Sequence, residues 1–193
     1  MFIGLTGTFG SGKSSVLKIF RKEGSFTISA DQIVHSLLRR KTVKGMVRTI
    51  FGPAVLKKGQ VNRPALAKIV FTDKEKRRKL EKLLHPKVKE KILDIARNFS
   101  RQKKLVVIEV PLLFESGFRE LFDYIVCVSA KPEVIRTRMQ KKGITTAEVE
   151  KRSSCQWGIS EKEKRSDAII ENNESRAKTE QQVKALMYKL KNM

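Results

Sequence analysis

The sequence of 193 residues has few cysteines, few aromatic residues and no long apolar run. Its two cysteines, Cys127 and Cys155, form no CxxC pair, which argues against a disulfide framework and against a zinc site. No stretch approaches the roughly 20 apolar residues of a membrane-spanning helix, and the apolar start Met1–Leu5 is too short for a signal peptide. Internal repeats and low-complexity linkers are also lacking. We therefore expect a protein of the reducing cytoplasm, with no membrane association and no obligate protein partner.

Acidic residues are in the minority, since 20 Asp and Glu stand against 42 Lys and Arg, a formal net charge of +22. This charge favours anionic partners such as nucleic acid, an acidic membrane surface or a polyphosphate ligand. It fits equally well a set of solvated, lysine-rich helix faces, as in Lys74–Lys79. No recognisable nucleic-acid-binding module is present, so no nucleic acid partner is expected.

Short apolar runs alternate with longer amphipathic segments, which is the pattern of an α/β domain. The expected strands are Phe2–Thr6, Phe26–Ser29, Leu105–Val110, Tyr124–Val128 and Ala168–Ile170. Two of them, at 105–110 and 124–128, are continuously apolar, as are parallel strands buried on both faces. Helices are expected after Lys13 and from about Ser175 to Lys191. The pattern predicts a mostly parallel five-stranded sheet flanked by helices.

Two helical segments interrupt this alternation. The stretch from about 32 to 102 contains no convincing strand, and Pro86 predicts a break or kink in its long helix near His85. A capping-box pattern at Thr72–Glu75 opens that helix. The segment from about 131 to 164 is basic and contains further helix-start signals. It is either a mobile lid over phosphate or an ordinary pair of helices with exposed charge.

The clearest motif is Gly7–Ser14, whose sequence GTFGSGKS matches G-x-x-x-x-G-K-[ST] between an expected strand and an expected helix. In such a P-loop, backbone N–H groups and the positive helix end surround the phosphates of a nucleotide. Lys13 is expected at the β and γ phosphates, and the Ser14 hydroxyl at Mg²⁺. The motif predicts the P-loop NTPase fold and a kinase that moves the γ-phosphoryl group of ATP to a small-molecule hydroxyl. The expected ATP-binding residues are Gly10, Ser11, Gly12, Lys13, Ser14 and Ser15.

Two carboxylates lie at the ends of expected strands, Asp31 after the second and Glu109 at the end of the third, where doubly wound sheets bind ligands. Asp31 is either the base that accepts the hydroxyl proton or the N-cap of the next helix. Glu109 either holds Mg²⁺ through a water molecule or is a simple strand-end carboxylate. His85 either contacts a substrate or is a polar residue at the expected kink.

With these residues in place, the chain resembles the dephospho-CoA kinase family over nearly its whole length. The P-loop is shared by many ATPases, whereas the PLLFE run with this spacing is far more specific. The matching segments are Ile3–Ser14, Ala30-Asp31, Arg63 with Leu66 and Ile69–Phe71, His85-Pro86, Pro111–Gly117, Arg136, Arg138, Arg152 with Gln156, and Asp167–Asn172.

The resemblance implies that ATP phosphorylates the 3′-hydroxyl of the dephospho-CoA ribose, giving coenzyme A and ADP in the last step of coenzyme A biosynthesis. It implies Asp31 as the base, with Lys13, Mg²⁺ and the lid residues Arg138 and Arg152 stabilising the transferring charge. Lys142 stands where the family usually has arginine, so it lacks the planar fork that clamps phosphate. The implied substrate-binding residues are Asp31, His85, Leu113, Phe114 and Glu115.

The same resemblance implies three parts within one domain: a nucleotide-binding core, a substrate-binding insertion and a lid. These are expected at about 1–31, 103–130 and 165–193 for the core, 32–102 for the insertion and 131–164 for the lid. Two other functions stay open. A kinase of nucleoside monophosphates or of another small metabolite would share the P-loop and lid, and a nucleic-acid-binding P-loop ATPase would use the positive charge.

Overall fold

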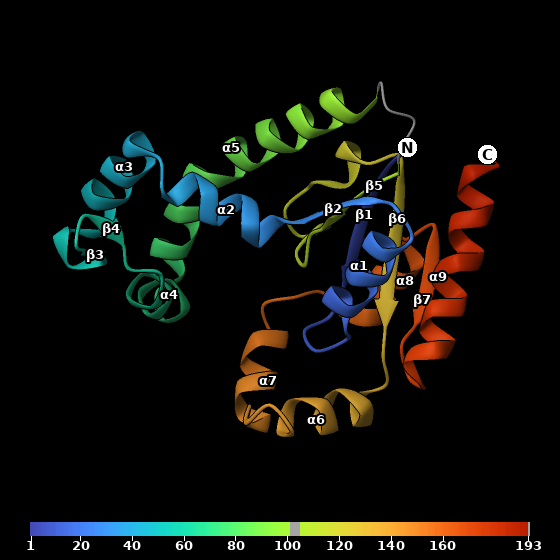
Figure 1. Ribbon diagram of the computed structural model, residues 1–193. Helices are drawn as coiled ribbons and strands as arrows, with labels where there is room; N and C mark the ends of the chain where they lie inside the picture. The colour runs from blue at the N-terminus through green and yellow to red at the C-terminus, as the bar shows by residue number, and fades with distance from the viewer. Residues whose placement is uncertain (101–104, 193) are drawn as a thin grey trace. The chain divides into compact units, whose positions relative to one another are not determined.

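The computed structural model describes residues 1–100 and 105–192, and its contacts divide the chain into two units. One unit comprises Met1–Ser29 and Ile95–Met193, and the other comprises Ala30–Asp94. Figure 1 shows the sheet in the first unit and a mainly helical second unit. The expected boundary between insertion and core, at 102–103, lies outside the described residues. Within the described ranges, no helix is both long and apolar enough to cross a membrane.

Parallel strands form the sheet of the first unit in the order β2-β5-β1-β6-β7. All five expected strands are confirmed, with ends that differ by one residue at most. Ile3 at the centre of the sheet pairs with Val107 on one side and with Tyr124 on the other. The strands are β1 (Phe2–Gly7), β2 (Phe26–Ser29), β5 (Val106–Glu109), β6 (Tyr124–Ser129) and β7 (Ala168–Glu171).

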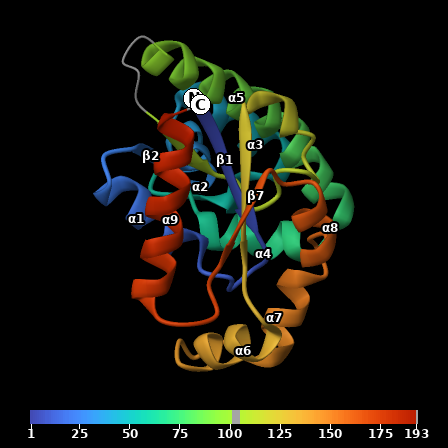
Figure 2. The ribbon, with the colours of Figure 1, turned by 90° about the vertical axis from the view of Figure 1, so that its right-hand side faces the viewer.

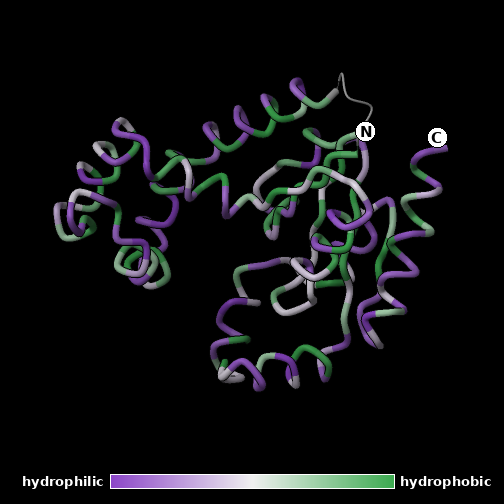
Figure 3. Tube along the Cα trace, viewed as in Figure 1, coloured by the Kyte–Doolittle hydropathy of each residue, from purple (hydrophilic) through white to green (hydrophobic). Residues whose placement is uncertain are grey.

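Helices cover both faces of this sheet. Figure 2 shows α1 (Lys13–Lys22) and α9 (Arg176–Lys191) on one side and α8 (Ile159–Lys164) on the other, where α8 packs on β1 and β6. Between β6 and α8 the chain forms α6 (Pro132–Gln140) and α7 (Thr146–Ser153), and a short 3₁₀ helix at Arg119–Leu121 precedes β6. In Figure 3 the central strands are coloured hydrophobic, whereas α9 alternates between the two colours.

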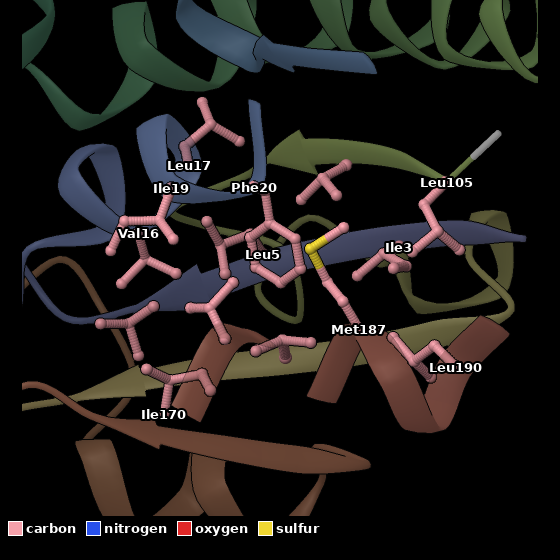
Figure 4. Packing of buried hydrophobic residues seen from close by; sticks show 14 residues of the cluster. Ile3, Leu5, Val16, Leu17, Ile19, Phe20, Leu105, Ile170, Met187 and Leu190 are labelled. Atoms are coloured by element: carbon pink, nitrogen blue, oxygen red, sulfur yellow. The ribbon is translucent and has the colours of Figure 1, made fainter. Parts of the chain in front are cut away.

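The core of the first unit lies between the sheet and the two helices α1 and α9. Phe20 of α1 is fully buried, and Figure 4 shows it beside Met187 of α9 above β1. The helix expected from about Ser175 to Lys191 is confirmed as α9, and its Val183, Met187 and Leu190 form an apolar stripe buried in this cluster. Burial of such a stripe is the main source of helix stability in a protein of this kind.

The second unit is built from four helices around a smaller aliphatic core. Leu38, Val47, Leu66 and Leu84 belong to this core and come from different helices. A short 3₁₀ helix, Pro53–Val55, follows the second helix. The helices are α2 (Ala30–Leu38), α3 (Lys41–Phe51), α4 (Arg63–Thr72) and α5 (Lys74–Ser100), whose residues from Ile95 onward belong to the first unit.

Two expectations about this unit are wrong. The long helix does not break, because α5 runs continuously through Pro86, so of the two expected alternatives only a kink stays open. Proline removes one N–H donor, but the buried Leu84 and Val88 hold the helix on both sides of it. The stretch also contains strands: β3 (Leu56–Lys57) and β4 (Gln60–Val61) form a short antiparallel hairpin. Strands of two residues are too short to produce the alternation by which strands are predicted.

The cysteines provide a test of the fold, since Cys127 is buried in β6 and Cys155 is exposed. Burial raises the pKa of the Cys127 thiol to about 11, because apolar surroundings disfavour the charged thiolate. We predict that a thiol reagent at about pH 8 modifies one cysteine of the native chain and both after unfolding. Cys155→Ser should abolish the native reaction, and Cys127→Ser should preserve it. Modification of both thiols in the native protein would contradict the burial of β6.

Candidate functional site

The P-loop leaves the carboxyl end of β1 and enters α1 at Lys13. Because β1 lies between β5 and β6, the loop projects from the middle of the carboxyl edge of the sheet. The first turn of α1 contains no acidic residue. The helix therefore adds no negative charge of its own at the positive end of its dipole, which suits an anionic ligand.

Gly12 shows why this loop requires glycine. It has φ 95° and ψ 22°, in the left-handed region, as the N-cap of α1. A Cβ atom at this position would lie 2.0 Å from Nδ2 of Asn172. That amide group donates to the Ser11 carbonyl at 2.8 Å, and its Oδ1 accepts from Thr179 Oγ1 at 3.0 Å. Asn172 thus fastens the P-loop to the end of β7 and to α9.

Lys13 is nearly buried, with 7% of its surface exposed. Its ammonium group donates to the carbonyl of Gly7 at 3.1 Å and to that of Thr8 at 2.8 Å. These bonds hold the cation against the start of the loop, within the turn formed by the motif. The position of the charge is therefore set by the backbone of the loop itself.

Ser14 and Glu109 meet at the adjoining strand ends. The Ser14 hydroxyl lies 3.2 Å from each carboxylate oxygen of Glu109. Glu109 is nearly buried at the end of β5, where it pairs with Leu5 of β1 and with Ser29 of β2. Mg²⁺ takes oxygen ligands and usually binds to one or two protein groups together with waters and substrate phosphates. A hydroxyl beside a carboxylate therefore fits a divalent ion that arrives with a nucleotide. In the part of the chain that the structure describes, no group of three or more His, Cys, Asp or Glu side chains is placed to hold a metal.

Arg138 of α6 lies beside the same loop. Its Nη2 atom is 3.5 Å from Asn172 Oδ1, and its Nη1 atom is 3.7 Å from where a Gly12 Cβ would lie. Nη1 is buried and has no hydrogen-bond partner among the described residues. A buried donor without a partner is costly and calls for an explanation. An anion bound at the P-loop would supply that partner.

Arg152 of α7 reaches the other side of the loop. Its guanidinium lies 4.8 Å from the centre of the Phe9 ring, a cation–π arrangement. Its Nη2 atom forms an ion pair with Glu148, one helical turn earlier. The structure therefore brings both predicted lid arginines to the P-loop. Arg152 has a carboxylate partner, whereas Nη1 of Arg138 has no hydrogen-bond partner in the part of the chain that the structure describes.

The loop after β5 turns its side chains into the first unit. Leu113 is fully buried, and its Cδ1 lies 2.6 Å from where a Gly4 Cβ would be. Phe114 stacks on Trp157, with ring centroids 6.0 Å apart and ring planes at 5°. Glu115 forms an ion pair with Lys162. The other oxygen of Glu115, Oε2, is buried and has no hydrogen-bond partner among the described residues.

Asp31 and His85 belong to the second unit. Asp31 lies in the first turn of α2, two residues after the end of β2, and its side chain is exposed. It is inside the helix, so the alternative of an N-cap for a helix that begins at residue 32 is wrong. His85 is half-buried in the middle of α5.

Three further polar residues contact the parts of the site named above: Asn172, Gln156 and Lys162. Gln156 accepts from the Phe9 amide, and Lys162 is a fully buried cation. Motif spacing gives no signal for these roles, because the partners are backbone groups or residues far away in the sequence. A lysine within a helix-start pattern looks like part of a solvated face.

Comparison with known proteins gives a consistent result. The family model described as dephospho-CoA kinase matches residues 1–178. The dephospho-CoA kinase of Listeria monocytogenes is 39% identical over 185 residues, covering 94% of this chain and 92% of that protein. The dephospho-CoA kinase of Aquifex aeolicus is 38% identical over 191 residues, covering 97% and 96% of the two chains.

Solved structures agree with these relatives. TT1252 from Thermus thermophilus has a TM-score of 0.83 at 32% identity, covering 98% of this chain and 97% of that one. A dephospho-CoA kinase from Campylobacter jejuni has a TM-score of 0.75 at 29% identity, covering 100% and 98%. A shikimate kinase from Bacteroides thetaiotaomicron, at 17% identity and a TM-score of 0.54 with 98% of each chain covered, shares the fold alone.

The P-loop at the carboxyl end of β1, the five-stranded parallel sheet and the match over residues 1–178 agree with one another. The resemblance first seen in the motifs GTFGSGKS and PLLFE is thereby confirmed. This chain belongs to the dephospho-CoA kinase family.

Proposed function

We propose that this chain transfers the γ-phosphoryl group of ATP to the 3′-hydroxyl of the dephospho-CoA ribose, giving coenzyme A and ADP. The observation that carries the proposal is the family match over residues 1–178 of a chain whose P-loop is intact. A P-loop kinase of this family uses ATP and, typically, a divalent metal. We assign Mg²⁺ as that metal because the ligands on offer are oxygen atoms.

The direct test is ADP release and coenzyme A formation by the purified protein. Dephospho-CoA should support turnover, whereas AMP and shikimate should give only the background rate. Phosphorylation of AMP or shikimate with no reaction on dephospho-CoA would replace the proposal with another small-metabolite kinase. Mass spectrometry of the product identifies the phosphorylated hydroxyl.

On the ATP side of the reaction, residues of the first unit have separate proposed roles. Gly10, Ser11, Gly12, Lys13, Ser14 and Ser15 bind the phosphates of ATP in this proposal. Lys13 stabilises the negative charge that develops on the transferred phosphoryl group. Arg138 donates a hydrogen bond from its buried Nη1 to the same phosphates. Arg152 joins them when its guanidinium exchanges Glu148 for phosphate.

The divalent ion is assigned to the Ser14 hydroxyl, with Glu109 behind it, either directly or through a water molecule. When bound there, Mg²⁺ supplies positive charge to the β and γ phosphates. Glu109 is buried, so its carboxylate is fixed in position and loses little side-chain freedom on binding the ion.

On the acceptor side, Asp31 is the proposed base. It accepts the proton of the 3′-hydroxyl or orients that hydroxyl toward the γ-phosphate. His85 and the loop Leu113–Glu115 are the other proposed acceptor elements. The helical unit and the segment with α6 and α7 are proposed as the substrate-binding part and the lid, respectively.

The first prediction concerns the base. Asp31→Asn keeps the size of the side chain but removes the proton acceptor, so kcat should fall about 100-fold or more. The Kd for MgADP should be unchanged, as measured by calorimetry. Glu90→Gln, an exposed carboxylate on α5 of the same unit, is the matched control and should retain the full kcat. A kcat for Asp31→Asn equal to that of the control would remove Asp31 from this role.

The second prediction concerns the metal. Ser14→Ala removes an oxygen ligand, so the Mg²⁺ concentration needed for half-maximal rate should rise at least about tenfold. Glu109→Gln should shift it in the same direction. Thr137→Ala serves as the control, because its hydroxyl is exposed on α6 and donates within its own helix to the Glu133 carbonyl. If the Mg²⁺ dependence of Ser14→Ala matches that of Thr137→Ala, Ser14 does not hold the ion.

A further inference from the structure

A buried ion pair joins α8 to the loop after β5. Lys162 is fully buried, and its ammonium lies 2.9 Å from Glu115 Oε1 and 2.7 Å from the Pro111 carbonyl that accepts its hydrogen bond. Glu115 Oε1 also accepts from the Trp157 amide at 2.8 Å. Burying two charges costs desolvation free energy, which good geometry and added hydrogen bonds only offset. A buried ion pair is therefore weak evidence that the fold is stabilised. What matters here is which parts of the structure the pair connects.

The pair is hydrogen-bonded to the segment that contacts the P-loop. Trp157, held by Glu115, follows Gln156, whose Oε1 accepts from the Phe9 amide at 2.8 Å. The Trp157 ring is fixed as well, because Phe114 stacks on it and the Arg165 guanidinium lies 5.0 Å from its centre. The residue next to Gln156 is therefore held by a hydrogen bond, a ring stack and a cation–π contact.

The peptide group that Gln156 holds is the one that binds Lys13. Its N–H, on Phe9, donates to Gln156. Its carbonyl, on Thr8, accepts from the Lys13 ammonium at 2.8 Å and from the Ser11 amide at 3.3 Å. Rotation of this peptide would turn the carbonyl away from Lys13. A hydrogen bond on its N–H side therefore holds one of the two carbonyl groups to which the Lys13 ammonium donates.

The same support reaches the base of the loop. The Pro111 carbonyl that receives Lys162 also lies 3.4 Å from the Thr6 hydroxyl, which donates to it one residue before the P-loop begins. Lys162 is thus connected to both sides of the motif: to its start through Pro111, and to its outer turn through Glu115, Trp157 and Gln156.

We propose that Glu115, Gln156, Trp157 and Lys162 form a brace that positions the Thr8–Phe9 peptide, and through it Lys13, for nucleotide binding. Gln156 is the positioning residue that touches the loop, and the buried pair holds Gln156 in place. The inference rests on the nucleotide site of the proposed function. It does not depend on the identity of the acceptor.

The test uses separate variants for the hydrogen bond from the P-loop to Gln156 and for the buried pair of Glu115 and Lys162. Gln156→Met removes the acceptor at nearly constant size on a half-buried side chain, and Gln181→Met makes the same change at an exposed position of α9. Lys162→Met breaks the buried pair, and Lys164→Met is its exposed counterpart on α8. Calorimetry gives the Kd for MgADP in the absence of dephospho-CoA, and thermal unfolding gives Tm.

We expect Gln156→Met to raise the Kd for MgADP by about threefold to tenfold, the effect of one lost hydrogen bond, with Tm close to wild type. The KM for ATP should rise in parallel, while the KM for dephospho-CoA should be unchanged. A purely structural role would lower Tm and the folded fraction but leave the Kd per folded molecule intact. A Kd for Gln156→Met equal to that of Gln181→Met would overturn the proposal.

Trp157 reports on the support directly, because it is the single tryptophan of the chain. Lys162→Met should raise both acrylamide quenching of Trp157 and the Kd for MgADP, whereas Lys164→Met should change neither. Increased quenching with an unchanged Kd would show that the pair does not act on the loop and would overturn that part. Lys162→Met leaves Glu115 buried without its cation, so the double variant Glu115→Gln with Lys162→Met, which removes both charges, is measured alongside it.

The double variant should recover Tm relative to Lys162→Met, and its Kd should stay above wild type because the Pro111 and Glu115 contacts of the lysine are lost. A wild-type Kd in a folded double variant would assign the pair to stability alone. Because MgADP binding is measured without an acceptor, failure of the brace leaves coenzyme A formation as a separate result. Failure to phosphorylate dephospho-CoA likewise leaves these affinities interpretable.

Discussion

The hydrogen bonding of β1 to β5 on one side and to β6 on the other is the constraint on which the rest of the site depends. Its register places Leu5 opposite Glu109 and Gly7 opposite Val128, so the P-loop begins where both neighbours end. The pairing of Ser129 with Glu171 extends the same alignment to β7 and delivers Asn172 to the loop. Polar groups far apart in the sequence therefore meet at one edge, which is the general behaviour of parallel sheets.

The sequence predicts those parts of the fold whose cause is local. Continuous apolar runs mark the strands because both faces of a parallel sheet are buried, and the runs at 105–110 and 124–128 became β5 and β6. The P-loop was predictable because its chemistry requires glycine, lysine and serine at fixed spacing. The lid arginines and Glu109 were also identified, and the structure places them beside this motif. The sequence is less informative about Pro86, where tertiary packing of Leu84 and Val88 overrides the helix-breaking tendency of proline.

Two residues that the sequence places in family-matching segments have roles that it does not reveal, because their partners are distant backbone groups. Gln156 binds an amide 147 positions away, and Asn172 binds a carbonyl 161 positions away. Neither partner has a side-chain identity that a motif could specify. Lys162 is hidden for a different reason: among 42 basic residues, a lysine between two glutamates looks solvated, and only the fold shows that it is buried. Conformation, rather than composition, determines which basic residues can act.

The same distinction applies to the two lid arginines and Lys142. Lys142 is exposed in the turn after α6, whereas Arg138 is half-buried and tied to Asn172, the residue that also fastens the P-loop. A cation that is already desolvated and oriented has less ordering free energy to lose when phosphate binds, and its guanidinium offers paired donors that an ammonium lacks. Arg152 must first leave Glu148, an exchange that a polyphosphate favours because it carries more negative charge than one carboxylate. In the proposed function, Arg138 is therefore oriented before the nucleotide binds, and Arg152 engages phosphate only after it leaves Glu148. With these roles, the proposed lid can bind phosphate although position 142 is a lysine, because Arg138 and Arg152 supply the planar guanidinium groups.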